Sequence, residues 1–303
     1  MYRCGDGELA DFDVGEGVAL LEMNAQVDRP IGMFDSGLGG LTVARAVIDS
    51  MPSENLVYIG DTARYPYGPK PASDVRSFAI ELATSLVRDF NAKLIVVACN
   101  TAASVALGEL QSSLSVPVIG VVEPGAQALV HATKNKRVAV IGTVGTIASG
   151  AYENAVASAS REISSEVVLT AAACPGFVEF VERDETSGEA VTELAEKLLA
   201  PIQKAGVDAL LLGCTHYPYL SAVISQVMGS SVKLINSADA TALVVRETLA
   251  NNKVARSVEA GTQDAPRVSG SHEFYSSGDV QQFAELGRRF LGPELSVAKQ
   301  WPK

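Results

Sequence analysis

The chain has 303 residues, of which 47% are hydrophobic and 19% charged, an ordinary composition for a soluble globular protein. Its net charge of −11 and the lack of a Lys/Arg-rich cluster argue against nucleic-acid binding, which needs a basic surface. No apolar run approaches the roughly 18 residues of a membrane span, and the acidic N-terminus lacks the basic start of a signal peptide. We therefore expect a cytoplasmic protein with neither a membrane nor a nucleic acid as partner.

The first 29 residues form a separate acidic segment. They hold seven acidic residues against two arginines, so nearly half of the net charge lies in a tenth of the chain. Four glycines add conformational freedom. We predict a flexible N-terminal extension over residues 1–29, either disordered or loosely docked. A regulatory arm is the alternative, and Met23 is a second candidate for the native start.

From residue 30 onward the pattern alternates between strands and helices. Apolar runs over residues 30–34, 56–60 and 94–98 predict strands, and apolar residues at helical spacing over 41–48 and 75–86 predict helices. Strands that alternate with helices indicate a parallel sheet with crossover connections.

A second round of the same pattern follows. It comprises a strand over 137–143, a helix over 189–205 and a strand over 209–213. Each round closes with an apolar strand, then a cysteine, then a short polar pair, which suggests two related halves. The remaining predictions are a strand or connector over 116–122, a loop over 251–273 and a terminal helix over 281–291.

Chemically active side chains follow the predicted strands where each strand ends. In open parallel sheets, ligands bind in the crevice beyond the carboxyl ends of the strands. If a helix follows each cysteine, its N-terminal amides would lower the pKa of the thiol and offer a site for a carboxylate. The groups at strand ends are Asp35-Ser36, Cys99-Asn100-Thr101, Thr143 and Cys214-Thr215-His216.

Two thiols facing each other across a crevice suit racemisation. Substrate and product are mirror images at one carbon, so one base must remove a proton from one face and one acid must supply a proton to the other. A thiolate and a thiol meet this need, and the pKa of cysteine can be tuned toward the working pH. Asp35, Glu182 and His216 are polar residues that could poise Cys99 and Cys214.

No metal or cofactor motif competes with this reading. The histidines are scattered and the cysteines include no CxxC pair, so we expect reduced thiols and no metal. The turn Gly37-Leu38-Gly39-Gly40 resembles a dinucleotide-binding loop, but Thr42 stands where the third glycine of GxGxxG belongs. We expect no cofactor.

Five segments resemble those of bacterial glutamate racemases. In order they cover residues 31–43, 65–68, 98–102, 174–182 and 213–218. The resemblance runs from about residue 30 to 292. One segment departs from the family pattern, because Glu179 and Phe180 stand where a proline and a leucine are common, although Glu182 keeps its offset.

The resemblance implies two pseudo-symmetric, doubly wound α/β domains with mainly parallel sheets and an active site in the crevice between them. The first domain would comprise residues 30–122 and 237–303, and the second would be the insertion 123–236. The family makes D-glutamate for peptidoglycan without a cofactor. Some relatives carry N-terminal extensions for control by a cell-wall precursor, and some are said to inhibit DNA gyrase; this sequence leaves both points open.

By the matching motifs, Cys99 would take the α-proton from D-glutamate and Cys214 from L-glutamate. Asp35 would assist near Cys99, while Glu182 and His216 would assist near Cys214. The residues implied to hold the substrate are Asp35, Ser36, Tyr67, Gly68, Cys99, Asn100, Thr101, Thr143, Thr146, Cys214 and Thr215.

Ordinary structural roles remain open for several of these residues. Asp35 is also placed to cap the helix that follows it, His216 to pack in the core, and Glu182 to lie on an acidic, solvated surface. Tyr65 and Tyr67 flank Pro66 in a turn-like loop where packing competes with binding.

Other functions also remain open. The same two-lobed pattern would also suit an aspartate or hydantoin racemase, or a decarboxylase of the same fold. It would equally suit a binding protein that captures a dicarboxylate between the lobes. The oligomeric state is open too, a homodimer being the commonest arrangement.

Because the acidic extension is expected to contribute little packing, deleting residues 1–22 should leave the fold intact. We expect the melting temperature to change by less than about 2 °C, which corresponds to roughly 1 kcal/mol or less. Thermal unfolding of the full-length and truncated chains measures this. A large loss of melting temperature would show that the extension is part of the folded core.

Overall fold

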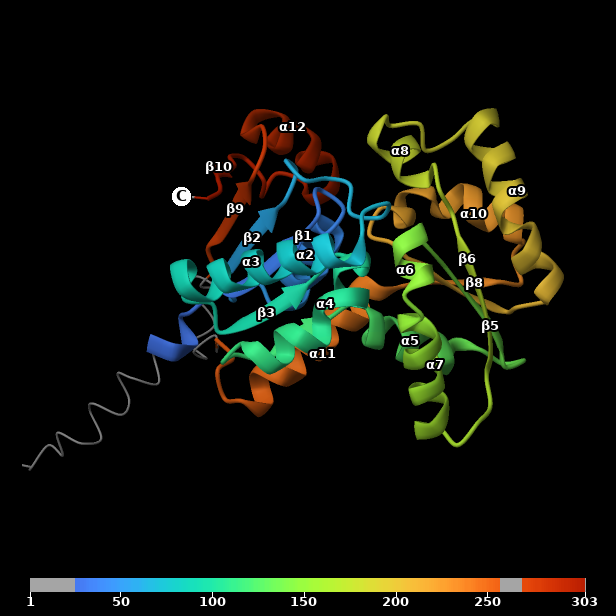
Figure 1. Ribbon diagram of the computed structural model, residues 1–303, viewed down its shortest axis with the longest axis horizontal. Coiled ribbons are helices and arrows are strands. Elements are labelled where there is room, and N and C mark those ends of the chain that lie inside the picture. The colour runs from blue at the N-terminus through green and yellow to red at the C-terminus, as the bar shows by residue number, and fades with distance from the viewer. Residues whose placement is uncertain (1–24, 257–268, 303) are drawn as a thin grey trace, which may run out of the picture.

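The computed structural model describes residues 25–256 and 269–302. Two lobes lie side by side, each built around one parallel sheet covered by helices (Figure 1). This confirms the predicted α/β class with parallel sheets. Most of the predicted N-terminal extension lies outside the described residues, so its structure is not tested.

The first lobe contains a six-stranded sheet of order β10-β9-β2-β1-β3-β4, with every neighbouring pair parallel. Two of its strands come from the C-terminal part of the chain, which returns to this lobe after the second one is complete. The strands are β1 (Ile31–Asp35), β2 (Leu56–Gly60), β3 (Leu94–Val97), β4 (Val118–Gly120), β9 (His272–Ser276) and β10 (Lys299–Gln300).

The second lobe contains a four-stranded parallel sheet of order β6-β5-β7-β8. In both sheets the first strand along the chain lies inside the sheet, with later strands added on either side, which is the doubly wound pattern. The strands are β5 (Arg137–Gly142), β6 (Val168–Ala173), β7 (Ala209–Gly213) and β8 (Lys233–Asn236).

Helices connect the strands and cover the faces of both sheets (Figure 1). Those of the first lobe are α2 (Leu41–Ser50), α3 (Ala72–Phe90), α4 (Asn100–Ser113), α11 (Ser237–Asn251) and α12 (Val280–Leu291). Those of the second are α6 (Val144–Ala148), α7 (Ala151–Glu162), α8 (Phe177–Glu182), α9 (Glu189–Ala205), the 3₁₀ helix η1 (Tyr217–Leu220) and α10 (Ser221–Met228). Helix α5 (Val122–Ala132) contacts both α7 and α11 and so joins the lobes.

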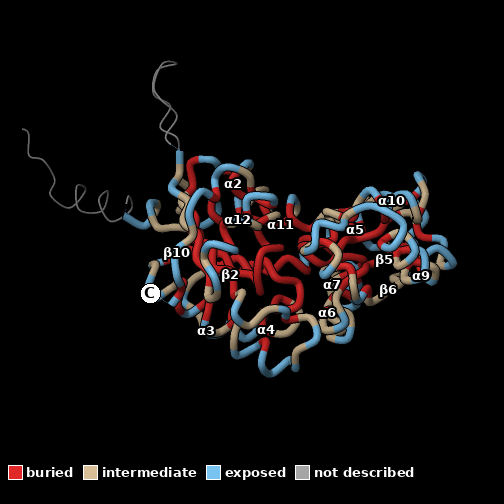
Figure 2. The backbone as a smooth tube through the Cα atoms, turned by 90° about the horizontal axis from the view of Figure 1, so that it is seen from above, coloured by how far each residue is buried: buried red, intermediate tan, exposed pale blue. Residues whose placement is uncertain are grey.

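Burial explains why the strands are short, apolar runs. Every residue of β1, β2, β3 and β7 is buried, as expected for parallel strands covered on both faces. Figure 2 shows the buried backbone running along the sheets and through the region where the lobes meet. Strand β6 differs, because its residues are only partly buried and three of the six are alanine.

Two predicted boundaries need correction. The strand predicted over 116–122 is confined to β4, because helix α5 already begins at Val122. The loop predicted over 251–273 ends two residues early, because His272 starts β9 and pairs with Leu56 of β2. Residues 257–268 of that loop lie outside the described part of the chain.

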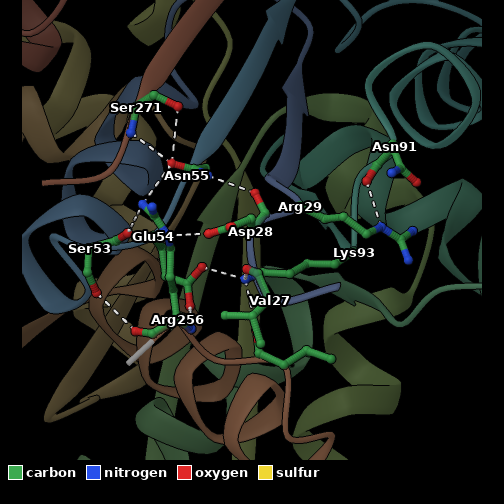
Figure 3. A network of polar contacts seen from close by, with 11 residues as sticks. Val27, Asp28, Arg29, Ser53, Glu54, Asn55, Asn91, Lys93, Arg256 and Ser271 are labelled. Atoms are coloured by element: carbon green, nitrogen blue, oxygen red, sulfur yellow. Dashed lines mark hydrogen bonds and ion pairs between the residues drawn. The ribbon is translucent and has the colours of Figure 1, made fainter. Parts of the chain in front are cut away.

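A buried ion pair closes the first lobe at the end of the sheet opposite the strand ends that carry the cysteines. Lys93 Nζ lies 2.6 Å from Glu54 Oε2 and also donates to the carbonyls of Val27 and Val254 (Figure 3). The other oxygen of Glu54 accepts from the backbone N–H of Arg256. One lysine thus ties together the start of the described chain, the loop before β2 and the segment after α11.

Removing one partner of a buried pair leaves the other charge unpaired in a place with little water. We expect Lys93→Met to lower the free energy of unfolding by about 3–5 kcal/mol. Chemical denaturation measures the change. The matched control is Lys299→Met, which removes an exposed pair with Glu273 and should cost less than about 1 kcal/mol. Equal losses in the two variants would contradict the role of the buried pair.

Candidate active site

A cavity of about 130 Å³ lies between the two lobes and is lined by both Cys99 and Cys214. One water needs roughly 10–15 Å³ by this measure, so the cavity has room for a small metabolite. Cys99 follows β3 of the first sheet, and Cys214 follows β7 of the second. The two thiols therefore reach one cavity from opposite lobes.

Most of the predicted site residues meet at this cavity. Three predicted residues are not part of its lining: Thr146 and Asp35 are buried, and Glu182 borders a neighbouring cavity beside Tyr65. The predicted residues that line the cavity are Ser36, Tyr67, Gly68, Cys99, Asn100, Thr101, Thr143, Cys214, Thr215 and His216.

Cys99 is the N-cap residue of α4, as the strand-then-helix pattern predicted. Its thiol donates to Ser36 Oγ at 3.7 Å. Burial and, to a smaller extent, the nearby Asp35 carboxyl raise the pKa of Cys99 to about 12. The expectation of a lowered pKa is therefore wrong for this thiol, because desolvation outweighs the donors at the start of α4. Cys99 is a protonated thiol at neutral pH.

Asp35 ends β1 and is buried. Its Oδ1 accepts from the N–H of Gly37 at 2.8 Å, while Oδ2 has no hydrogen-bond partner among the described residues. Burial raises the pKa of Asp35, and the charge of His216 partly offsets this. Helix α2 begins after Gly40 with no side-chain cap, so Asp35 serves the turn before the helix rather than its N-terminus.

The surroundings of Cys214 differ from those of Cys99. A turn and then η1 follow Cys214, and the α-helix α10 begins only at Ser221. The predicted α-helix N-terminus is therefore absent directly after this thiol. The 3₁₀ helix η1 that stands there contains Pro218, which has no backbone N–H to donate. Instead, His216 Nδ1 lies 3.9 Å from Cys214 Sγ.

His216 links Cys214 to Glu182. Its Nε2 lies 3.4 Å from Glu182 Oε1, within ion-pair distance although without an aligned hydrogen bond. Burial alone would lower the pKa of His216, but Cys214 and Glu182 together raise it to about 10. The imidazole therefore carries a positive charge at neutral pH. The Cys-Thr-His motif predicted that His216 lies near Cys214, whereas the raised pKa of His216 also depends on Glu182 and Asp35, which only the fold brings close.

Three threonine hydroxyls form a triangle across the gap between the lobes. Thr101 Oγ1 lies 3.0 Å from Thr143 Oγ1 and 3.2 Å from Thr146 Oγ1, and the latter two are 2.9 Å apart. Thr101 belongs to α4, while Thr143 and Thr146 belong to the N-cap and first turn of α6. Hydroxyls can rotate to suit a ligand, so this cluster can donate to a carboxylate.

The loop after β2 brings Tyr67 and Gly68 to the cavity. The Tyr67 hydroxyl donates to Asp61 Oδ2, so this polar end is already engaged by the first lobe. Gly68 approaches the second lobe closely: its carbonyl accepts from Gly145 N at 3.0 Å, and a Cβ at position 68 would lie 2.9 Å from Thr143 Cβ. A side chain at position 68 would push the lobes apart.

Several lining residues are not among the predicted site residues. For Tyr65 the sequence left packing and binding both open: its ring centroid lies 6.3 Å from that of His216, and it borders both the main cavity and the one beside Glu182. In the sequence, the only indication of a site role for Tyr65 was its place in the same turn-like loop as Pro66 and Tyr67. The other additional lining residues are Pro66, Pro69, Val144, Cys174, Pro175, Gly176, Val178, Glu179 and Tyr217.

The cavity lining, all of it within the described residues, includes no lysine or arginine. His216 supplies its positive charge, and hydroxyls, amides and backbone groups supply the remaining donors. An anionic ligand would thus be held by local hydrogen bonds, because the acidic net charge of the chain does not attract it.

The described residues hold neither a membrane-spanning helix nor a metal-binding cluster. No helix among them combines the length and hydropathy that crossing a lipid bilayer requires. No group of three or more His, Cys, Asp or Glu side chains in the same residues is arranged to hold a metal ion.

Comparison with known proteins points to one family. The Asp/Glu/hydantoin racemase family model matches residues 41–245. The glutamate racemase of Beutenbergia cavernae is 48% identical over 88% of this chain and 91% of its own length. A glutamate racemase structure from Bacillus anthracis has a TM-score of 0.79 at 38% identity, covering 89% of this chain and 96% of that one. A structure from Francisella tularensis, in complex with D-glutamate, has a TM-score of 0.78 at 30% identity, covering 90% and 96%.

The charge on His216 can be tested through Glu182. Because the carboxylate stabilises the imidazolium, Glu182→Gln should lower the His216 pKa from about 10 by about one unit or more. Because folding raises the pKa of His216, its protonated form stabilises the folded state. This stabilisation is complete at pH values below the ordinary histidine pKa of 6.5 and is lost as the pH rises toward 10. In the variant this contribution should be smaller, and its loss should be complete at a lower pH.

NMR of the His216 ring between pH 6 and 11 measures this pKa directly. The matched control is Glu185→Gln, because Glu185 pairs with Arg183 on the surface. An unchanged His216 pKa in Glu182→Gln would rule out the proposed coupling.

Proposed function

This chain belongs to the Asp/Glu/hydantoin racemase family and is an isomerase that racemises glutamate, and on that basis we propose that Cys99 and Cys214 exchange the α-proton of the substrate. One observation carries the proposal: two thiols from opposite lobes line a single small cavity. A substrate held between them can lose its α-proton from one face to become a planar carbanion, which then gains a proton on the other face.

The proton balance is simple. Starting from L-glutamate, the Cys214 thiolate takes the α-proton and becomes a thiol, leaving a carbanion stabilised by the substrate carboxylate. The Cys99 thiol then donates its proton to the opposite face, which gives D-glutamate and a Cys99 thiolate. The reverse reaction exchanges the roles, and proton exchange with solvent restores the starting state.

The surroundings of the thiols support this assignment of starting roles. The high pKa of Cys99 keeps it protonated and ready to act as an acid. The His216 imidazolium, 3.9 Å from Cys214 Sγ, stabilises negative charge on that sulfur. In this proposal Glu182 holds the charge of His216, and Asp35 is the polar partner on the Cys99 side.

The neutral donors around the cavity would hold the two carboxylates of glutamate. Asn100, Thr101 and Thr215 follow the two cysteines directly, and Thr143 with Thr146 completes the hydroxyl cluster. Ser36 and the backbone of the Tyr67-Gly68 turn would add further donors.

The setting of the reaction follows from the family. We propose that the enzyme acts in the cytoplasm without a cofactor and that its D-glutamate supplies peptidoglycan synthesis. The division into domains over 30–122 with 237–303 and over 123–236 also stays a proposal, as does a homodimer.

The two-thiol mechanism predicts that Cys99→Ala and Cys214→Ala each lose racemisation by at least about 10³-fold, within the range expected for a lost acid or base. Chiral analysis after incubation with L- or D-glutamate measures this. In heavy water, each variant should exchange the α-proton of only one enantiomer: L-glutamate for Cys99→Ala and D-glutamate for Cys214→Ala.

Cys4→Ala is the control and should racemise like the unmodified enzyme. Full activity in either active-site variant would remove the mechanism. A panel containing aspartate and hydantoins tests the related racemases. Tight binding of glutamate with no α-proton exchange in the unmodified chain would instead indicate a binding protein.

A further inference from the structure

We propose that Tyr152 is a positioning residue that reaches across from the second lobe and sets the orientation of the Asn100 amide beside Cys99. The inference rests on the proposed function, because it assigns the Asn100 amide to a carboxylate of the substrate. Tyr152 was singled out neither by the sequence motifs nor by the residues that line the cavity.

The contact joins the two lobes. Tyr152 is the second residue of α7 and is fully buried. Its hydroxyl donates to Asn100 Oδ1 at 2.6 Å, over a separation of 52 residues. Asn100 is the first residue of α4, lines the cavity and directly follows Cys99. Figure 1 shows α7 and α6 on the side of the second lobe that faces α4, and α4 contacts both.

The two ends of the Asn100 amide are in different situations. Oδ1 is occupied by the Tyr152 hydroxyl, whereas Nδ2 is buried and has no hydrogen-bond partner in the described part of the chain. An unpaired buried amide is costly in a folded protein unless a ligand satisfies it. Nδ2 is thus the end of this side chain that remains for the substrate.

Orientation matters because the substrate is an anion. An amide that presents its N–H groups attracts a carboxylate, whereas the flipped amide presents an oxygen and repels it. Burial raises the pKa of Tyr152, so its hydroxyl keeps its proton and stays a donor. A constant donor at Oδ1 holds the N–H end toward the ligand.

Other contacts hold the same edges of the lobes together. The threonine triangle and the hydrogen bond from Gly145 N to the Gly68 carbonyl both cross this gap. Removing the Tyr152 hydroxyl should therefore disturb the amide more than the approach of the lobes.

The experiment is Tyr152→Phe in the full-length chain, which removes the hydroxyl and keeps the ring. We expect KM to rise about tenfold for both L- and D-glutamate, with kcat changed by less than about threefold, because roughly one hydrogen bond to the substrate is weakened. Tyr275→Phe is the matched control: its hydroxyl donates to Glu273, outside the cavity, and KM should stay the same.

A double-variant cycle separates positioning from packing. In an Asn100→Ala background, Tyr152→Phe should change KM by less than about twofold, because the amide it orients is gone. Additive effects, or an unchanged KM in Tyr152→Phe, would overturn the proposal.

Asn100→Asp gives a second test that does not alter Tyr152. It keeps the acceptor for the hydroxyl and replaces the Nδ2 donor by a carboxylate oxygen, so KM should rise more than in Tyr152→Phe. An unchanged KM would also overturn the proposal, even if Tyr152→Phe failed to fold. If the unmodified chain did not racemise glutamate, the proposed function itself would be refuted. That result differs from a failure of the Tyr152 proposal, in which the unmodified chain is active and the variants keep their KM.

Discussion

The close approach of the two lobes is the constraint on which the site depends. Both sheets are parallel, so the groups that follow their strands gather at one end of each sheet, and those ends meet at the cavity. The approach requires residues without side chains. A Cβ at Gly39, in the turn after β1, would lie 2.2 Å from Thr215 Oγ1, in the turn after β7. A larger residue there would separate the turns that carry Asp35 and Cys214. The glycine-rich turn, which superficially resembles a nucleotide loop, thus serves contact between lobes.

The same close approach determines the electrostatics of the site. Burial at the lobe interface raises the pKa of Cys99, while Cys214 and the nearby carboxylates of Glu182 and Asp35 raise the pKa of His216. Charges in such a place are poorly screened by water, so each group strongly influences its neighbours. The cavity therefore gains a positive charge from histidine, not from a lysine or arginine. The histidine charge lies 3.9 Å from the Cys214 sulfur.

Sequence reasoning succeeded where local patterns dictate the structure. Buried strands read as continuous apolar runs, and cysteines directly after 94–98 and 209–213 marked the strand ends. It did not find strand β6, whose partly exposed, alanine-rich residues lack a strong strand pattern. It also could not weigh burial against the start of a helix, so it misjudged the pKa of Cys99. Tyr152 lay beyond its reach, because only the folded chain brings α7 to the start of α4.

The two half-sites are chemically different, although the reaction they serve is symmetric. One thiol lies beside Ser36 and a buried carboxyl, the other beside a charged histidine. Enantiomers have equal free energies, so the equilibrium constant of racemisation is one, and kcat/KM must be the same in both directions for every variant. The asymmetry of the half-sites can therefore change kcat and KM for L- and D-glutamate individually, but it cannot make kcat/KM differ between the two. It acts through the protonation state that the resting enzyme prefers. The imidazolium 3.9 Å from the Cys214 sulfur is part of this asymmetry, and it favours neither product at equilibrium.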